Sequence, residues 1–250
     1  MEIQIFDTKE RCGVAAADKA GDILEKAIAA EGHACFVAAT GVSQFEFLKT
    51  LTGKGSIDWE RTTMYHLDEY IGLSEDHPAS FRRFLRERLI DSVHPGNVHL
   101  IQGDAEDPYA ECRRLNALFP REGIDVAFLG IGENGHLAFN DPPADFATEE
   151  PYIVVELNEA CRQQQLGEGW FATLEEVPRR AISMSIQQIM KARTIICTAP
   201  DKRKAEAVKQ CLEGEISPDH PASILRRHPS VFMYLDRDSA SMLEKDVKVL

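Results

Sequence analysis

The chain has 250 residues, of which 44% are hydrophobic and 28% are charged. These proportions are typical of a globular protein and predict a single domain over residues 1–250. The formal net charge of -13 excludes nucleic acid and anionic membrane surfaces as general partners, so an anionic ligand requires a local basic pocket.

Cellular location and redox state are inferred from motifs that the sequence lacks. No apolar stretch reaches the roughly 20 residues that cross a bilayer, and the first residues lack the basic and apolar blocks of a signal peptide. We therefore expect a cytoplasmic protein without a membrane-spanning helix. The six cysteines have no C-x-x-C spacing, so we expect buried thiols and neither a disulfide nor a metal site.

Short apolar runs bounded by turn residues alternate with longer helical patterns along the chain. They predict strands at Ala34–Ala39, Thr62–His66, Val98–Ile101, Asp125–Gly130, Tyr152–Leu157, Thr194–Thr198 and Val231–Leu235. They predict helices at Asp7–Ala30, Ser43–Thr52, Pro78–Val93, Ala105–Phe119, Lys202–Leu212 and Pro221–Arg226. This alternation is typical of the α/β class, in which helices cover both faces of a mostly parallel sheet.

The longest expected irregular stretch runs from Asn140 to Tyr152. It contains Pro142, Pro143 and Pro151. Long irregular segments beside a binding site are often lids. We therefore expect a lid within residues 140–175.

Small polar residues follow the first predicted strand, and ligands of open α/β sheets bind beyond the carboxyl ends of strands. The sequence there is Thr40-Gly41-Val42-Ser43. Hydroxyl groups, unpaired backbone N–H groups and the positive end of the next helix would together hold a phosphate. The alternative is a glycine turn in which Ser43 caps the helix. Thr40, Gly41 and Ser43 are thus candidate phosphate-binding residues.

Two adjacent carboxylates, Asp68 and Glu69, follow the second predicted strand. A carboxylate that aromatic neighbours shield from water acquires a raised pKa and can act as a general base. The alternative is that Asp68 caps a turn and Glu69 is solvated. Asp68 is therefore a candidate catalytic residue.

The fourth predicted strand runs into a glycine-rich segment, Gly130-Ile131-Gly132-Glu133-Asn134-Gly135-His136. Its Gly-x-Gly-x-x-Gly spacing matches the dinucleotide-binding fingerprint, but that fingerprint opens directly into an apolar helix. The residues after His136 are polar and broken by proline, so we expect no dinucleotide and no other cofactor. Gly132 instead lets the backbone approach a ligand closely.

His136 is the strongest single catalytic candidate, because imidazole titrates near neutral pH and moves protons in both directions. Asn134 and Asp141 flank it in the sequence. Such groups fix the tautomer of a catalytic histidine or relay its proton. We therefore group Asn134, His136 and Asp141 as candidate catalytic residues.

Three cations, Lys202, Arg203 and Lys204, stand where a late strand ends and a helix begins. Each exposed cation at a helix N-terminus opposes the helix dipole by about 0.3–1 kcal/mol. A bound anion would offset that cost, so the cluster predicts a phosphate clamp. The alternative is a solvated basic face.

In this order the motifs resemble those of the glucosamine-6-phosphate deaminase (isomerase) family, over residues 30–240. They are Thr-Gly-x-Ser at 40–43, Leu-Asp-Glu-Tyr-x-Gly-Leu at 67–73, Gly-x-Gly-x-Asn-Gly-His-x-x-Phe-Asn at 130–140 and the lysine of the late helix. The resemblance implies a three-layer αβα, Rossmann-like fold. It also implies conversion of glucosamine 6-phosphate and water to fructose 6-phosphate and ammonia, without a redox cofactor.

The resemblance also implies roles for the candidate residues. His136 would assist opening of the pyranose ring, with support from Asn134 and Asp141. Asp68 would move the C2 proton of the open-chain sugar to C1 through an enediol-type intermediate. The turn at 40–43 and Lys204, which falls at the family's lysine position, would hold the phosphate. The implied partner is a small amino-sugar phosphate, and the sequence leaves open whether the chain forms a homo-oligomer.

The chain departs from the family pattern at three places. Asp141 stands where many members have the longer Glu, so its reach to His136 must be checked, and Asn134 stands where some members have Asp. The segment 163–171 lacks the phosphate-binding Arg that typical members carry before an aromatic pair. Either the substrate differs in detail, or another cation replaces that Arg. The candidate replacements are Arg162, Lys202 and Arg203.

The stretch 145–152 contains no basic side chain. In allosterically activated members of the family, basic lid residues bind N-acetylglucosamine 6-phosphate. We therefore predict no activation by that effector. A sigmoidal rate curve that becomes hyperbolic when N-acetylglucosamine 6-phosphate is added would contradict this prediction.

Two other functions stay open. A 6-phosphogluconolactonase has a similar fold and a similar glycine-rich segment, although residues 67–70 and 139–142 fit the deaminases better. A non-catalytic sugar-phosphate-binding module, as in some bacterial transcription regulators, also has a similar fold. Such regulators carry a helix-turn-helix, for which this chain has neither spare length nor a basic patch. The presence of both Asp68 and His136 favours catalysis.

Overall fold

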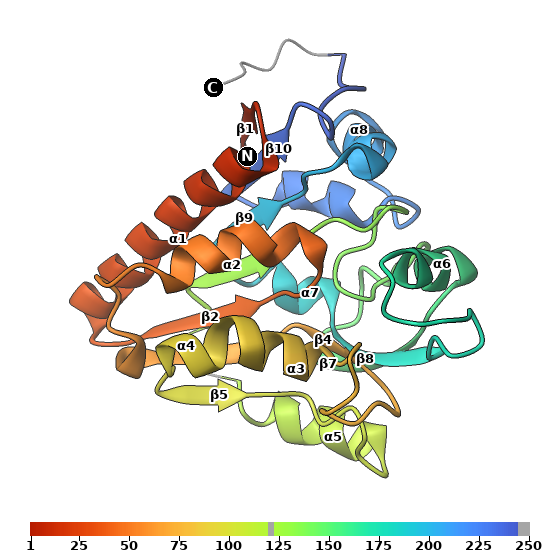
Figure 1. The fold of residues 1–250 in the computed structure, drawn as a ribbon, viewed down its shortest axis with the longest axis horizontal. Helices are drawn as coiled ribbons and strands as arrows, with labels where there is room; N and C mark the ends of the chain where they lie inside the picture. The colour runs from red at the N-terminus through yellow and green to blue at the C-terminus, as the bar shows by residue number, and fades with distance from the viewer. Residues whose placement is uncertain (120–122, 245–250) are drawn as a thin grey trace.

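A parallel sheet of seven strands forms the centre of the computed structural model, which describes residues 1–119 and 123–244 (Figure 1). Its strand order is β1-β10-β9-β6-β2-β3-β5, and its pairings are parallel. The bounds are β1 (Glu2–Phe6), β2 (Ala34–Ala38), β3 (Thr62–His66), β5 (Asn97–His99), β6 (Val126–Leu129), β9 (Thr194–Thr198) and β10 (Val231–Asp236). The predicted domain extends to residues 245–250, which lie outside the described residues.

A second, antiparallel sheet has the strand order β4-β8-β7. Its strands are β4 (Asp68–Tyr70), β8 (Arg180–Met184) and β7 (Tyr152–Glu156). The strand predicted at 152–157 is therefore β7 of this small sheet and not a member of the parallel one. The sequence did not predict β4, because a strand of three residues with two carboxylates shows no apolar alternation.

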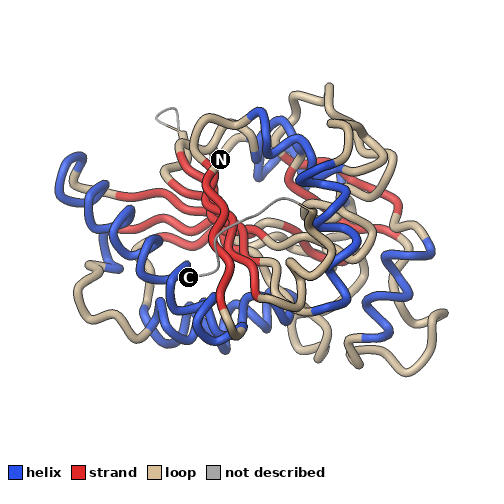
Figure 2. Tube along the Cα trace, turned by 90° about the horizontal axis from the view of Figure 1, so that it is seen from above, coloured by secondary structure: helices blue, strands red, loops and turns tan. Residues whose placement is uncertain are grey.

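Helices cover both faces of the parallel sheet and give three layers (Figure 2). One face carries α1 (Lys9–Glu31), α2 (Phe45–Thr52) and a continuous stretch of α3 (Phe81–Leu85), the π-helix η3 (Arg86–Ile90) and α4 (Asp91–Val93). The other carries α5 (Pro108–Asn116), α7 (Ile186–Ile189), α8 (Ala205–Glu213) and the 3-10 helix η5 (Pro221–Arg227). The other helices of the described residues are η1 (Val42–Gln44), η2 (Trp59–Arg61), α6 (Glu159–Gly167) and η4 (Lys202–Lys204). The predicted αβα fold is confirmed.

The residues of β2 show why the strands of the parallel sheet are apolar runs in the sequence. Phe36 and Ala38 pack with α1 and α2, whereas Val37 packs in the cluster on the opposite face. Successive side chains of a strand point to opposite faces, so a strand covered on both faces is apolar throughout. The ring of Phe36 lies 5.5 Å from that of Phe128 in β6, and such a pair adds about 0.5–1.5 kcal/mol beyond its buried area.

Local signals set the ends of the helices. Thr8 caps α1, since its hydroxyl accepts from Arg11 N, and Gly32 ends α1 with a φ of 77°. Asp107 caps α5 and Pro108 occupies its first turn, so α5 is shorter than the helix predicted at 105–119. The segment predicted as a helix at 221–226 is the 3-10 helix η5. Among the described helices, none is long and apolar enough to cross a membrane.

His66, at the end of β3, is fully buried, and neither ring nitrogen has a hydrogen-bond partner among the described residues. Burial, together with the charge of Arg82, lowers the pKa of His66 to about 3. In the unfolded chain an imidazole takes up a proton below about pH 6.5. The unfolded state therefore binds more protons between these two pH values, and the free energy of unfolding falls as the pH is lowered through them.

We predict that His66→Asn weakens this acid sensitivity, because an amide does not titrate. Urea denaturation at a series of pH values measures the effect. Below about pH 6, His66 contributes a loss of roughly 1.4 kcal/mol per pH unit to the wild type, and the variant should lack that contribution even if it is less stable at pH 7. Parallel curves for the two proteins would contradict the prediction.

Candidate active site

A pocket lies at the carboxyl ends of the parallel strands, where the sequence predicted it. The predicted site residues that line it are Thr40, Gly41, Ser43, Asp68, Gly132, His136 and Lys204. Asn134 and Asp141 do not line the pocket but contact His136. Parallel strands end at one edge of their sheet, so segments distant in the sequence meet there.

The turn after β2 is shaped by Gly41, whose φ of 95° falls in the region that favours glycine. Gln44, which is 1% exposed, fixes the turn from the interior. Its amide donates hydrogen bonds to Ser43 Oγ, Leu129 O and Thr198 Oγ1 at 2.8–3.2 Å. Since Ser43 Oγ accepts from Gln44, the Ser43 hydroxyl proton is available to a ligand. The turn thus presents donors to an anion.

Asp68 begins β4 and pairs in register with Ser183 of β8. It is 6% exposed and Glu69 is fully buried, so the alternative of a capped turn with a solvated Glu69 is wrong. Burial, and then the charge of Glu69, raise the pKa of Asp68 well above its usual value. A carboxylate with a raised pKa is a stronger base, which suits removal of a proton from carbon.

Glu69 holds the strand of Asp68 against α3. Its carboxylate accepts hydrogen bonds at 2.8–3.1 Å from Tyr70 N, Ser80 Oγ, Phe81 N and Arg82 N. Arg82 is 2% exposed, and its Nε lies 3.6 Å from Glu69 Oε2. Loss of one partner of such a buried pair costs about 3–5 kcal/mol. This network therefore fixes the backbone that carries Asp68.

His136 is held by a carboxylate and an amide. Its Nδ1 lies 3.2 Å from Asp141 Oδ1, so the shorter Asp side chain does reach the imidazole. Asn134 Nδ2 donates to Asp141 Oδ1 at 3.0 Å, and Asn134 Oδ1 accepts from His136 N at 3.1 Å. Burial acts to raise the pKa of Asp141, but hydrogen bonds from His136, Asn134 and Asn158 N hold that pKa below its usual value. An ionised Asp141 keeps a proton on Nδ1 and leaves Nε2 as the acceptor.

Gly132 makes room for the imidazole. A Cβ at position 132 would lie 2.3 Å from the His136 ring, which is far inside van der Waals contact. Gly132 N also donates to His136 O at 3.0 Å. The sequence predicted a close approach of Gly132 to a ligand; the close approach in the structure is to His136, and Gly132 lies in the wall of the pocket.

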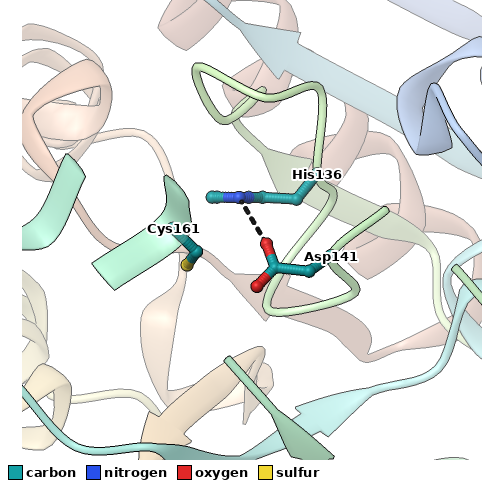
Figure 3. A group of neighbouring side chains, drawn as sticks. All are labelled: His136, Asp141 and Cys161. Carbon is teal, nitrogen blue, oxygen red and sulfur yellow. Dashed lines mark ion pairs between the residues drawn. The ribbon is translucent and has the colours of Figure 1, made fainter. Parts of the chain in front are cut away.

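Cys161 forms a group with His136 and Asp141 (Figure 3). One potential metal-ligand atom of each residue lies within 4.8 Å of the other two. A cysteine binds metal as the thiolate. However, burial first, and then the charge of Asp141, raise the pKa of Cys161 well above its usual value. We therefore interpret Cys161 as a protonated thiol that shields Asp141 from water.

Lys204 is the buried cation of the pocket, with 8% exposure. Burial lowers the pKa of Lys204, and the charges of Glu168 and Glu133 oppose that effect. Asp201, the residue directly before η4, has a φ of 94°, which is strained for a non-glycine residue. Strain of this kind gathers at functional sites, and Asp201 lines the pocket together with Arg203 and Lys204.

The cations that were candidates to replace the missing Arg either pair with carboxylates or do not line the pocket. Arg203 lines the pocket but pairs with Asp201 at 3.2 Å and with Glu133 at 3.5 Å. Arg162 donates to Val177 O and Leu174 O and does not line the pocket, nor does Lys202. The additional cation of the pocket wall is Lys9, at the start of α1, which was not predicted from the sequence.

A polar wall of the pocket, formed by α6 and the residue after it, was not predicted from the sequence. Gln164, Gln165 and Glu168 line the pocket. Their helix was not predicted because its sequence, EACRQQQLG, has no clear apolar period. The segment where a phosphate-binding Arg was expected thus contributes two amides and a carboxylate.

The sequence of this chain is similar to those of known proteins. The family described as glucosamine-6-phosphate isomerases/6-phosphogluconolactonase matches residues 7–233. A glucosamine-6-phosphate deaminase of an Exiguobacterium species is 43% identical over 81% of this chain and 77% of its own length. One of Thermoanaerobacter pseudethanolicus is 37% identical over 92% of each chain.

Structural comparisons agree with the sequence matches. A monomeric glucosamine-6-phosphate deaminase has a TM-score of 0.89 at 33% identity, over 97% of this chain and 100% of that one. A 6-phosphogluconolactonase of Shewanella baltica has a TM-score of 0.77 at 21% identity, over 94% of this chain and 98% of its own, and so shares the fold alone. Fold and pocket define an enzyme of the sugar-phosphate-converting class. The chain belongs to the glucosamine-6-phosphate isomerase/6-phosphogluconolactonase family.

Proposed function

We propose that this protein is a glucosamine-6-phosphate deaminase that converts glucosamine 6-phosphate and water to fructose 6-phosphate and ammonia. The observation that carries the proposal is the meeting in one pocket of the buried base Asp68, the His136–Asp141 pair and the anion cradle at 40–43. Isomerisation of a sugar phosphate requires two proton-transfer groups and a fixed phosphate. The relatives named above are glucosamine-6-phosphate deaminases at 33–43% identity.

The first step is opening of the pyranose ring by His136. With Nδ1 facing the Asp141 carboxylate at 3.2 Å, Nε2 takes the proton of the C1 hydroxyl. The C1–O5 bond breaks, C1 becomes an aldehyde, and the ring oxygen receives a proton from the imidazolium. Asp141 stabilises that imidazolium, because its own lowered pKa keeps it ionised.

The second step moves a proton between carbons. Asp68 takes the C2 proton, the C–H electrons form a C1–C2 double bond, and the C1 carbonyl oxygen takes up a proton from solvent, which is balanced by a proton that later leaves with the nitrogen as ammonium. Asp68 then returns its proton to C1, and the nitrogen lone pair forms an imine at C2 as the C1 hydroxyl is retained. Water adds to C2 and ammonium leaves, which gives the ketone. One carboxylate serves both transfers because its raised pKa allows it to hold the proton in between.

The test of the proposal is ammonia release and fructose 6-phosphate formation from glucosamine 6-phosphate. The same protein is assayed with 6-phosphogluconolactone and, by calorimetry, for sugar-phosphate binding. Ammonia release supports the deaminase. Lactone hydrolysis without ammonia release would favour a 6-phosphogluconolactonase, and binding without either reaction would favour a non-catalytic module.

Lys204 provides a test of the phosphate end of the pocket. Lys204→Met should raise KM about 10- to 100-fold, because a charge-assisted hydrogen bond contributes about 1.5–3 kcal/mol, and should change kcat much less. Lys202→Met is the matched control, since Lys202 is exposed and does not line the pocket. Steady-state kinetics with glucosamine 6-phosphate give KM and kcat for both variants. A KM that is equal in the two variants would contradict a phosphate role for Lys204.

The proposal extends to the setting of the enzyme. It includes a cytoplasmic location, a small amino-sugar phosphate as partner and a single domain whose lid lies within residues 140–175. The irregular stretch before β7 and helix α6 both fall in that range, and α6 contributes residues to the pocket wall. Size-exclusion chromatography with light scattering tests whether the chain forms a homo-oligomer.

A further inference from the structure

Helix α6 presents one buried face to the catalytic group. Cys161 and Gln165 are four residues apart, so they lie on the same side of the helix. Cys161 is adjacent to the His136–Asp141 pair. One turn further on, Gln165 lines the pocket together with Asp68 and His136. The position of Gln165 is therefore set by the same packing that shields Asp141.

Among the described residues, the side-chain amide of Gln165 has a protein hydrogen-bond partner at its oxygen but not at its nitrogen. Gln165 is 5% exposed, and its Oε1 accepts a hydrogen bond of 2.6 Å from the Tyr70 hydroxyl. Within the described part of the chain, the amide nitrogen of Gln165 has no hydrogen-bond partner. That nitrogen is not among the fully buried atoms that lack a partner, and Gln165 lines the pocket, so its two N–H groups remain available to an acceptor there. A ligand in the pocket is the partner that the geometry provides.

Tyr70 fixes which end of the amide faces the pocket. Tyr70 is fully buried, and its ring packs against Phe139 and Phe171 at 5.0 and 5.6 Å. It belongs to β4, two residues after Asp68, so the hydroxyl that orients Gln165 is rigidly linked to the base. The phenol donates to the carbonyl oxygen, and the two N–H groups are left to point away from it.

We propose that Gln165 is a substrate-binding residue that donates its amide protons to an oxygen of the sugar carbon chain, beside the carbons between which Asp68 moves a proton. This deepens the proposed function and rests on it. A neutral donor suits a hydroxyl or carbonyl oxygen, whereas the phosphate is held by the turn at 40–43 and by Lys204. Gln165 thereby recognises the sugar portion of a sugar phosphate and not its phosphate.

The experiment compares three variants. Gln165→Met keeps the length and the helix propensity but removes the donor. Tyr70→Phe removes the hydroxyl that orients Gln165 but leaves the donor. Gln163→Met makes the same substitution on the exposed side of α6. Binding of fructose 6-phosphate and of inorganic phosphate is measured by calorimetry, and KM and kcat are measured with glucosamine 6-phosphate.

Gln165→Met should weaken fructose 6-phosphate binding about tenfold, or about 1.4 kcal/mol, and leave the affinity for inorganic phosphate within twofold. Tyr70→Phe should have a smaller effect, and Gln163→Met should match the wild type. A purely structural role would weaken both ligands together or make Tyr70→Phe as damaging as Gln165→Met, and either result would overturn the proposal. Undiminished fructose 6-phosphate binding by Gln165→Met, or a wild type that binds phosphate but no sugar phosphate, would also overturn it. Sugar-phosphate binding without ammonia release would overturn only the proposed reaction.

Discussion

Replacement of Asp68 by Asn is expected to lower kcat by about 10²- to 10⁴-fold, the usual contribution of a positioned general base. The amide has the size of the carboxylate but cannot accept the C2 proton. The surrounding network of Glu69 and Arg82 does not involve the Asp68 carboxylate, so the backbone of β4 should keep its position. Steady-state kinetics with glucosamine 6-phosphate measure the loss.

Stability separates a catalytic role of Asp68 from a structural one. A raised pKa in the fold means that folding disfavours the ionised carboxylate, so at pH 7 the ionised Asp68 costs free energy. Asp68→Asn should therefore unfold at an equal or higher temperature than the wild type while it loses activity. Asp76→Asn, on an exposed residue, is the control that should change neither. A variant that loses activity and stability together would argue for a structural role.

The pH dependence of the wild type follows from the same shift. Since burial raises the pKa of Asp68, the acidic limb of kcat/KM should lie above pH 4, the range of an ordinary Asp. Activity is lost as the pH falls through the raised pKa, because the base is then protonated. The limb should be absent from the residual activity of Asp68→Asn.

The sequence predicted the parallel sheet well because burial on both faces leaves a strong signal. Phe36, Val37 and Ala38 are apolar in succession, and such short runs between turn residues mark central strands. Strand β4 could not be found in this way. Its two carboxylates are buried by partners distant in sequence, namely Ser80 and Arg82 of the α3 region and Ser183 of β8. Asp68 and Glu69 therefore form a strand because of their tertiary contacts and not because of a local sequence pattern.

In the candidate site, too, some residues could be predicted from sequence motifs and others only from their tertiary contacts. Residues directly after a strand, such as Ser43, Asp68 and His136, were identifiable because the carboxyl edge of a parallel sheet is where ligands bind. Gln44 and Gln165 were not, since a glutamine has no sequence signature and acquires meaning only from its hydrogen bonds. The contact between Asp141 and His136 could not be predicted from the sequence either, because an Asp is shorter than the Glu of many family members. Gly132 lets the His136 ring lie close to the loop, and the Asp carboxylate then reaches Nδ1.

His136→Gln should lower turnover of glucosamine 6-phosphate by about 10²- to 10³-fold, within the range for a general acid–base group. Gln can still donate a hydrogen bond to Asp141, which limits the structural damage, but it cannot carry a proton from the C1 hydroxyl to the ring oxygen. The loss should therefore fall on ring opening and leave the transfer by Asp68 intact.

Deuterium exchange at C1 of fructose 6-phosphate distinguishes the two roles. Fructose 6-phosphate opens spontaneously in solution, so the open-chain form reaches Asp68 without help from His136. In deuterated buffer, His136→Gln should retain most of the C1 exchange that the wild type catalyses, whereas Asp68→Asn should lose it. Equal loss of exchange in the two variants would contradict a ring-opening role for His136 and would place both groups in the proton transfer between C2 and C1. The two groups belong to different elements, the imidazole to the loop held by Asp141 and the buried carboxylate to β4, and we therefore expect two distinguishable defects.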